Sequence, residues 1–148
     1  MRQPNSRLWL VIPIIFVAWI GQTWAGPQTG ESQAETLRWQ LLGPPGGEEV
    51  FDVDVDPNDP MRIYTTSRAG VFRSTDGGAS WSQSRTGFFS EVVVNPQDGD
   101  VVYACPGVCK STDGGDTWNC YSEGMTDTHV VSLAIAASSP NVLFAGSF

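Results

Sequence analysis

The chain has 148 residues, of which 41% are hydrophobic, and it contains 16 glycines and 10 prolines with a net charge of −8. This length allows one domain at most, and the glycine and proline content suits a turn-rich all-β protein. An acidic chain without a basic cluster argues against binding to nucleic acid or to an anionic membrane surface.

Residues 1–25 have the pattern of an export signal. Arg2 and Arg7 give a positively charged start, and an apolar run from Leu8 to Ile20 follows. Small residues before Gly26 then favour cleavage after Ala25. We therefore expect a signal-peptide helix at the start and an exported mature chain, periplasmic or extracellular.

The apolar run is shorter than the roughly 20 residues that a membrane-spanning helix needs, and Pro13 weakens a long helix. We therefore expect no membrane segment after signal cleavage, with an uncleaved anchor as the alternative. The polar residues 26–36 are expected to form a flexible linker.

Strand signals separated by turn-forming residues fill the rest of the chain and recur in the same order. The turns are Pro57–Pro60, Pro96–Gly99 and Ala137–Pro140. Tyr64, Tyr103 and Phe144 fall at equivalent places after them. The expected strands before these turns are Val53–Asp56, Val92–Asn95 and Leu133–Ala136, those after them are Met61–Thr66, Asp100–Cys105 and Asn141–Gly146, and third strands are Gly70–Ser74 and Gly107–Ser111.

One phrase occurs twice, each time at the end of a third strand. Its pattern is Ser-x-Asp-x-Gly-x-Ser/Thr-Trp, and a fourth strand is expected to leave from each Trp. Asp and Ser side chains hold tight turns by bonding local backbone N–H groups, and Gly accepts positive φ. The two copies consist of Ser74, Asp76, Gly78, Ser80 and Trp81, and of Ser111, Asp113, Gly115, Thr117 and Trp118.

This phrase resembles the Asp-box, or BNR repeat, of sialidase-like, sortilin-like and photosystem-assembly-factor-like β-propellers. The resemblance implies that the box is a structural hairpin turn on the rim, away from any catalytic centre, with its Trp in the core. Four short strands per unit of roughly 40 residues is also the sequence pattern of a propeller blade. We therefore expect Trp81→Ala to cost about 3–5 kcal/mol by removing a core plate.

The resulting fold class is an all-β propeller fragment over residues 37–148. We place blade 1 at about 50–86, blade 2 at about 91–124 and half of blade 3 at about 130–148. Leu37–Leu42 is expected to be a lead-in outer strand, because Trp39 precedes Pro57 much as Trp81 precedes Pro96. Propellers usually have four to eight blades, so a piece of a longer protein is expected. Self-association through the open blade edges is the alternative.

Three cysteines lie together in the second unit, and export makes a disulfide plausible. Cys109 and Cys120 flank one hairpin turn and are the favoured pair, whereas Cys105 with Cys109 is the rival pair. His129 is the only histidine, so neither a zinc site nor a catalytic cysteine is expected.

Asp52, Asp54 and Asp56 alternate along one strand and should share one face, opposite Phe51, Val53 and Val55. On an innermost strand these carboxylates would line a channel, where they suit Ca²⁺ or the carboxylate pair of sugar chemistry. Solvated turn residues are the simpler interpretation. We therefore expect no metal and no cofactor.

Two enzyme families that share the box resemble this chain only partly. Sialidases need three arginines, a Tyr nucleophile with a Glu partner and an Arg-Ile-Pro phrase, whereas here Arg62-Ile63 is followed by Tyr64. Xyloglucan-cleaving propellers carry a catalytic Asp four residues after a Tyr, and Arg68 stands there instead. No catalytic residue is therefore identified in this chain.

The function expected from the sequence is an exported, non-catalytic binding or scaffold module. Its partner would be a protein or a carbohydrate. A sialidase-like or xyloglucanase-like glycoside hydrolase with catalytic residues elsewhere is the alternative. The expected contact loops are Gly43–Glu49, Ser67–Gly70 and Gly87–Ser90, with one of Phe88 and Phe89 exposed and packing of both between blades as the other interpretation.

Overall fold

The computed structural model describes residues 16–19, 38–41, 43, 49–121, 123–125 and 129–147. These residues form β-strands and turns. In this part of the chain no helix is long and apolar enough to cross a membrane.

Two four-stranded antiparallel sheets form the body of the structure. The first consists of β3 (Val50–Val55), β4 (Ile63–Ser67), β5 (Gly70–Ser74) and β6 (Ser82–Thr86), which are neighbours in that order. The second repeats the order with β7 (Glu91–Asn95), β8 (Asp98–Cys105), β9 (Val108–Ser111) and β10 (Asn119–Tyr121). A third, two-stranded sheet pairs β11 (Val130–Ile135) with β12 (Leu143–Ser147).

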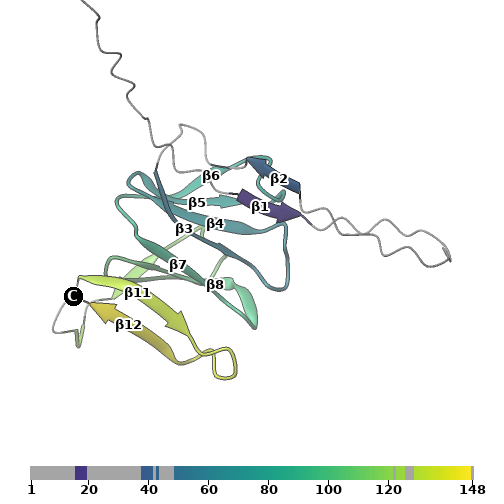
Figure 1. Cartoon of the computed structure of the whole chain (residues 1–148). Coiled ribbons are helices and arrows are strands. Elements are labelled where there is room, and N and C mark those ends of the chain that lie inside the picture. The colour runs from purple at the N-terminus through teal and green to yellow at the C-terminus, as the bar shows by residue number, and fades with distance from the viewer. Residues whose placement is uncertain are drawn as a thin grey trace, which may run out of the picture.

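The three sheets are stacked face to face, and the first strands β3, β7 and β11 of successive sheets lie side by side (Figure 1). This arrangement of up-and-down antiparallel sheets is that of consecutive β-propeller blades. The predicted all-β propeller fold is therefore confirmed. We refer to the three sheets as blade 1, blade 2 and blade 3.

The connectivity places the loops of each blade at two opposite ends. The β4–β5 hairpin and the β6–β7 connection lie at one end, which we call the loop end. The β3–β4 and β5–β6 connections lie at the other, because successive strands are antiparallel. Both copies of the repeated phrase fall on the second end, which we call the turn end.

The core consists of apolar clusters between the blades. Between blades 1 and 2, Trp118 packs against two clusters: Tyr64, Val92, Val94 and Val102, and Val71, Phe89, Ala104 and Cys109. Between blades 2 and 3 lies a third cluster of Cys105, Val108, Val130 and Leu133. The apolar surfaces that face each other in successive blades are thus buried together, as in repeat proteins whose single units cannot bury their own core.

Residues 16–19, which belong to the expected signal peptide, do not form the expected helix. Phe16–Trp19 forms a strand, β1, paired antiparallel with β2 (Arg38–Leu41). The predicted signal-peptide helix is therefore wrong for these four residues, since aromatic and β-branched residues favour a strand when a partner strand is at hand. The strand predicted at Leu37–Leu42 is present as β2. The linker 26–36 and the cleavage site after Ala25 lie outside the described residues.

The two Trp residues of the repeated phrase have different surroundings. Both are half-buried, but Trp118 packs between two blades, whereas Trp81 belongs to none of the three described clusters. The expectation that Trp81 is a core plate is corrected accordingly.

We predict that Trp118→Ala lowers the free energy of unfolding by about 3–5 kcal/mol, as for other buried large-to-small changes. Trp81→Ala should cost clearly less, because the side chain has fewer neighbours to lose. Urea unfolding followed by fluorescence and circular dichroism measures both. Equal losses in the two variants would contradict the assignment of Trp118 as the interblade residue.

Candidate functional site

The repeated phrase forms the same hydrogen-bonded turn in both blades. The Ser74 hydroxyl donates to Asp76 Oδ1 (2.8 Å) and accepts from the Gly78 N–H (2.8 Å). Asp76 Oδ1 then accepts from the Ser80 N–H (2.8 Å), and Trp81 Nε1 donates to the Gly78 carbonyl (3.1 Å). The second copy repeats these bonds through Ser111, Asp113, Gly115, Thr117 and Trp118. The side chains of the phrase therefore satisfy the turn itself.

The two turn aspartates are held in the ionised form. The hydroxyl of Ser80 donates to Asp76 Oδ2 (2.5 Å), and with the backbone N–H of Ser80 and the hydroxyl of Ser74 it lowers the pKa of Asp76 to about 2. Thr117 has the same effect on Asp113, whose pKa is also lowered to about 2. A carboxylate with this pKa is an acceptor and not a general acid near neutral pH.

The second turn also docks on blade 1. The Tyr64 hydroxyl (2.9 Å) and Arg73 Nη1 (2.5 Å) both donate to the Gly114 carbonyl, while the Ser84 hydroxyl donates to the Gly115 carbonyl. Trp118 Nε1 lies 2.9 Å from Ser84 Oγ. Side chains from three strands of blade 1 thus bind the backbone of one turn of blade 2.

An ion pair reinforces this contact. Arg73 Nη2 lies 2.8 Å from Asp116 Oδ1, on the same turn. Nearer the turn end, Arg62 Nη1 lies 2.6 Å from Asp100 Oδ1 and 3.7 Å from Asp56 Oδ2. Arg62 and Arg73 are therefore both engaged between blades 1 and 2.

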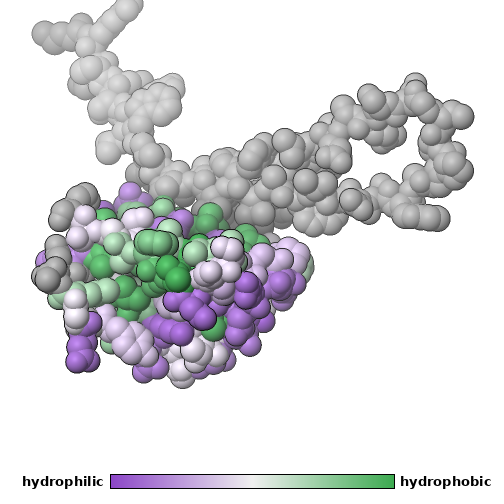
Figure 2. Space-filling view, turned by 90° about the horizontal axis from the view of Figure 1, so that it is seen from below, coloured by the Kyte–Doolittle hydropathy of each residue, from purple (hydrophilic) through white to green (hydrophobic). Residues whose placement is uncertain are grey.

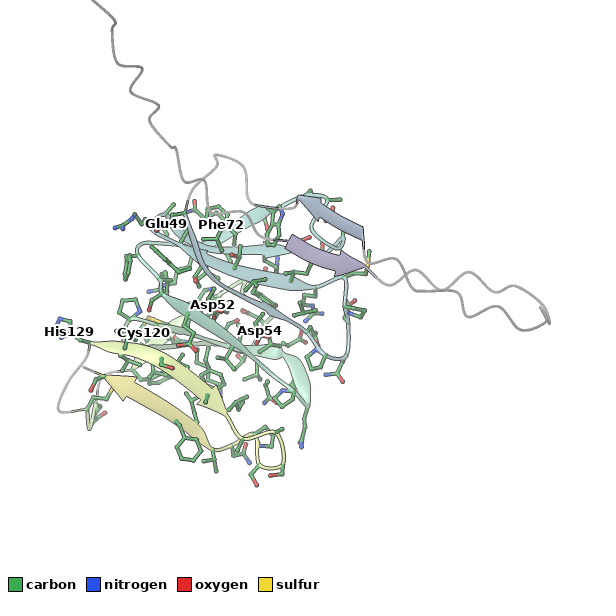
Figure 3. All side chains as sticks on the ribbon, viewed as in Figure 1. Glu49, Asp52, Asp54, Phe72, Cys120 and His129 are labelled. Atoms are coloured by element: carbon green, nitrogen blue, oxygen red, sulfur yellow. A yellow bond between two sulfur atoms is a disulfide. The ribbon has the colours of Figure 1, made fainter. Side chains whose placement is uncertain are left out.

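The alternating aspartates of β3 face blade 2 (Figure 3). Asp52 Oδ2 accepts from the Val92 N–H (3.0 Å), and Asp54 Oδ2 accepts from the Val94 N–H (2.8 Å). Burial raises the pKa of Asp54, against the opposing effect of the hydrogen bonds that it accepts from the backbone N–H groups of Val94 and Val55. In blade 2, Glu91 Oε2 accepts from the Leu133 N–H of blade 3 (2.8 Å) in the same way.

These carboxylates therefore join the inner strands of successive blades. Asp56, the third of the series, is 2% exposed and accepts from the Asn58 N–H (2.8 Å) within its turn. Among the described residues, no group of three His, Cys, Asp or Glu side chains is placed to hold a metal ion. The sequence missed this interblade role, because alternation gives the face of a side chain but not its partner.

Cys109 and Cys120 form a disulfide between directly opposite residues of β9 and β10. This is the favoured of the two pairings left open by the sequence. Cys105 is free and buried, with Sγ 3.3 Å from Ser90 Oγ, and burial raises the pKa of its thiol. A protonated, enclosed thiol is a poor nucleophile.

Side chains from the expected contact loops meet at the loop end of blade 1. The rings of Phe51 and Phe88 lie 5.5 Å apart, and Arg68 Cζ lies 5.5 Å from the Phe51 centroid. Arg68 Nε is 3.3 Å from Glu49 Oε2, at the end of the molecule where Glu49 is labelled in Figure 3. We call Glu49, Phe51, Arg68 and Phe88 the loop-end cluster.

The exposure of this cluster settles the question of the adjacent phenylalanines. Phe88 is 49% exposed, whereas Phe89 is 5% exposed and packs in the core. Of the loop Gly43–Glu49, only Gly43 and Glu49 lie within the described residues. The sequence analysis placed Phe51 only on one face of a strand and did not include it among the contact residues. Its position two residues after the expected contact loop Gly43–Glu49 is the sequence feature that could have indicated its place in the cluster.

The loop-end cluster contains groups that can contact a partner. It combines an exposed ring, a guanidinium over a second ring and one carboxylate. Aromatic residues and arginine dominate the binding energy of protein interfaces, and cation–π contacts fix the arginine.

Comparisons with known proteins identify the fold. No protein-family model and no curated protein matches the sequence. The solved structures that resemble the chain include an ancestral GH74 enzyme, with a TM-score of 0.62 and 23% identity over 73% of this chain and 17% of that one. YCF48 from Cyanidioschyzon merolae has a TM-score of 0.59 and 24% identity over 74% of this chain and 34% of that one. A GH74 enzyme from Niastella koreensis has a TM-score of 0.55 and 19% identity over 72% of this chain and 20% of that one. The chain thus spans between 17% and 34% of the length of these structures, and the likeness shows a shared β-propeller fold.

We predict an acid-sensitive contribution to stability from the two turns. In the folded state the pKa of Asp76 and of Asp113 is lowered from 3.8 to about 2. The ionised carboxylates therefore stabilise the fold above about pH 4, and this contribution is lost as the pH falls towards 2. Asp54, whose pKa is raised, has the opposite sign and does not add to this loss. Thermal melts at pH 7, 4, 3 and 2 measure the effect.

The matched control for this prediction is Asp76→Asn with Asp113→Asn, which removes both titrations. The double variant should be less stable at pH 7 and should lose less of its remaining stability between pH 4 and pH 2. The same acid-induced loss in both proteins would refute the assignment to these aspartates.

Proposed function

We propose that this chain is an exported, non-catalytic binding or scaffold module of the Asp-box (BNR) propeller type. The turn chemistry supports the Asp-box relationship, because each residue that the phrase specifies has a bond in the turn. The proposed binding surface is the loop-end cluster, and its partner is a protein or a carbohydrate.

The observation that carries this proposal is the partly exposed but fixed ring of Phe88. Phe88 packs on Phe51, and Arg68, whose side chain is 70% exposed, covers the other ring. A ring held in place by its neighbours loses little conformational freedom when a partner binds. It offers an apolar plate to a sugar ring or to an apolar side chain, and Arg68 and Glu49 offer polar bonds beside it.

Catalysis is the less supported function for these residues. Glycoside hydrolysis generally uses two carboxyl groups flanking the bond, and the loop-end cluster holds one. Asp52, Asp54 and Glu91 are occupied as acceptors between blades. The candidate pair for sugar chemistry is therefore engaged in the architecture.

A glycoside hydrolase is the second candidate function. The observation that favours it is that two of the solved structures named above are described as GH74 enzymes. The catalytic residues would then belong to a part of the protein other than the described blades.

The test combines an activity assay with a binding assay on the full chain. We expect no release of reducing ends from xyloglucan above the buffer blank. A glycan array that includes xyloglucan fragments, and immobilised envelope proteins of the source organism, would then be probed with wild type and variants. Phe88→Ala and Arg68→Ala should each weaken the captured interaction about tenfold or more, a loss of about 1.4 kcal/mol.

Tyr121→Ala is the matched control, because Tyr121 is 55% exposed and lies on β10 of blade 2, outside the loop-end cluster. Binding that Phe88→Ala and Arg68→Ala leave unchanged would exclude this cluster as the binding surface. Cleavage of xyloglucan would instead favour the hydrolase.

A further inference from the structure

A polar pocket lies between β6 of blade 1 and the second turn of blade 2, and it shares no residue with the loop-end cluster. Its volume is about 460 Å³, and it is lined by Gln83–Thr86 of β6 and by Asp116 and Trp118 of the turn. Both blades that form it have four strands. The apolar patch that Figure 2 shows from below lies on the side of β11 and β12, which contribute no residue to this pocket. We call it the edge pocket.

An irregularity in β6 turns two successive side chains towards blade 2. The pairing of β6 with β5 shifts by one residue, which leaves Ser84 as an extra residue of β6. Ser84 Oγ lies 2.9 Å from Trp118 Nε1 of blade 2. Arg85 lies opposite Val71, which belongs to the core cluster between blades 1 and 2. Residues directly opposite in a sheet share a face, so Arg85 also faces blade 2.

The corresponding strand of blade 2 is regular as far as β10 is described. Tyr121 stands at the place of Ser84 in the repeat, and it lies directly opposite Val108, the counterpart of Val71. The extra residue is therefore a feature of blade 1 and not of the repeat. β-bulges re-aim side chains and are over-represented next to active sites, so this bulge marks the edge pocket as a place to seek a ligand.

Arg85 is the arginine of blade 1 whose charge has no carboxylate partner within the described residues. The other three each have one: Arg62 pairs with Asp100, Arg68 with Glu49, and Arg73 with Asp116. Arg85 Nε is buried without a hydrogen-bond partner, and Arg85 Cζ lies 5.7 Å from the centroid of the Phe89 ring. Arg73 Nε is also without a partner, but both Nη atoms of Arg73 are bound. A buried donor without an acceptor is costly and calls for a water, an ion or a ligand.

The charges around the edge pocket favour an anion. Asp116 lines the pocket, but its carboxylate is paired with Arg73 at 2.8 Å. Arg73, Arg85 and Asp116 together leave one positive charge, in a chain whose net charge is −8. A guanidinium presents its N–H groups in a fork that matches a carboxylate. The ligand group that fits Arg85 is therefore a carboxylate.

The strand that carries Arg85 is also the edge of its sheet. β5 is the only neighbour of β6 among the described strands. Every second residue of such an edge strand directs its backbone N–H and C=O groups away from the sheet. An extended peptide can pair with such an edge, and its side chains then give specificity. Because four consecutive residues of β6 line the edge pocket, the pocket follows this edge.

We propose that the edge pocket binds an extended acidic peptide. The peptide backbone pairs with the free edge of β6, and a glutamate or aspartate carboxylate of the peptide accepts hydrogen bonds from Arg85. Trp118 forms the wall of the pocket on the side of blade 2. This inference does not depend on the loop-end cluster.

The test measures the affinity of the full chain for two short labelled peptides by fluorescence anisotropy. Both alternate Thr and Val around a central residue, which is Glu in one peptide and Gln in the other. The Gln peptide should bind about tenfold more weakly, because it lacks the charge-assisted bond to Arg85. Arg85→Gln should weaken binding of the Glu peptide to a similar extent and should leave the affinity for the Gln peptide almost unchanged.

Lys110→Gln is the matched control. It removes a different cation that lies over a ring, since Lys110 Nζ is 5.4 Å from the centroid of Tyr103, and Lys110 does not line the edge pocket. This variant should bind both peptides like the wild type. Circular dichroism should show the same fold in both variants.

The comparison of the two peptides on the wild type needs no variant, so it stands even if Arg85→Gln fails to fold. Equal affinities for the Glu and Gln peptides, or binding of neither, would overturn the proposal. A Glu peptide with N-methyl groups on alternate residues should bind far more weakly, and unchanged binding would exclude pairing with β6. Binding of an oligogalacturonate instead of either peptide would also overturn it, because the carboxylate site would then belong to an acidic saccharide.

Discussion

The docking of the second turn on blade 1 is the contact on which the rest of the structure depends. Tyr64, Arg73 and Ser84 come from three adjacent strands, and all three donate to carbonyls of Gly114 and Gly115. These carbonyls are available because the turn satisfies its own N–H groups through Ser111 and Asp113. The turn thus arrives preformed, with acceptors on its outer side, and Trp118 fills the apolar space beneath it.

Five of the described acidic side chains are engaged in the turns or between the blades. The aspartates of the turns hold the turns, and Asp52, Asp54 and Glu91 hold the inner strands of successive blades. Buried backbone N–H groups need an acceptor, and here a neighbouring blade supplies it as a carboxylate. The proposed binding surface uses loop side chains such as Phe88 and Arg68 instead.

The sequence predicted what is local and repeated. Turn residues around Pro57 and Pro96 placed β3, β4, β7 and β8 to within a few residues, because Pro, Asn, Asp and Gly impose turn conformations whatever their surroundings. The opposite positions of Cys109 and Cys120 followed from the hairpin in the same way. The expected contact loops followed from where the turns lie.

Relations between blades could not be predicted from periodicity. Alternation placed Asp52 and Asp54 on one face, but nothing local shows that this face meets the N–H groups of Val92 and Val94. The two Trp residues have identical local sequence, and only the presence of a neighbouring sheet distinguishes Trp118 from Trp81. The helix predicted for residues 16–19 was wrong for a related reason. These residues form a strand whose partner, β2, lies far along the chain.

Amide hydrogen exchange tests the central claim most directly, by comparing Gly115 with Gly78. Both N–H groups donate to the serine of their own turn at 2.8 Å, and both glycines are buried. Only the turn of Gly115 is docked on another blade within the described residues. The account predicts that the Gly115 amide exchanges only through global unfolding, whereas the Gly78 amide exchanges faster through local opening. Equal protection of the two amides would contradict it.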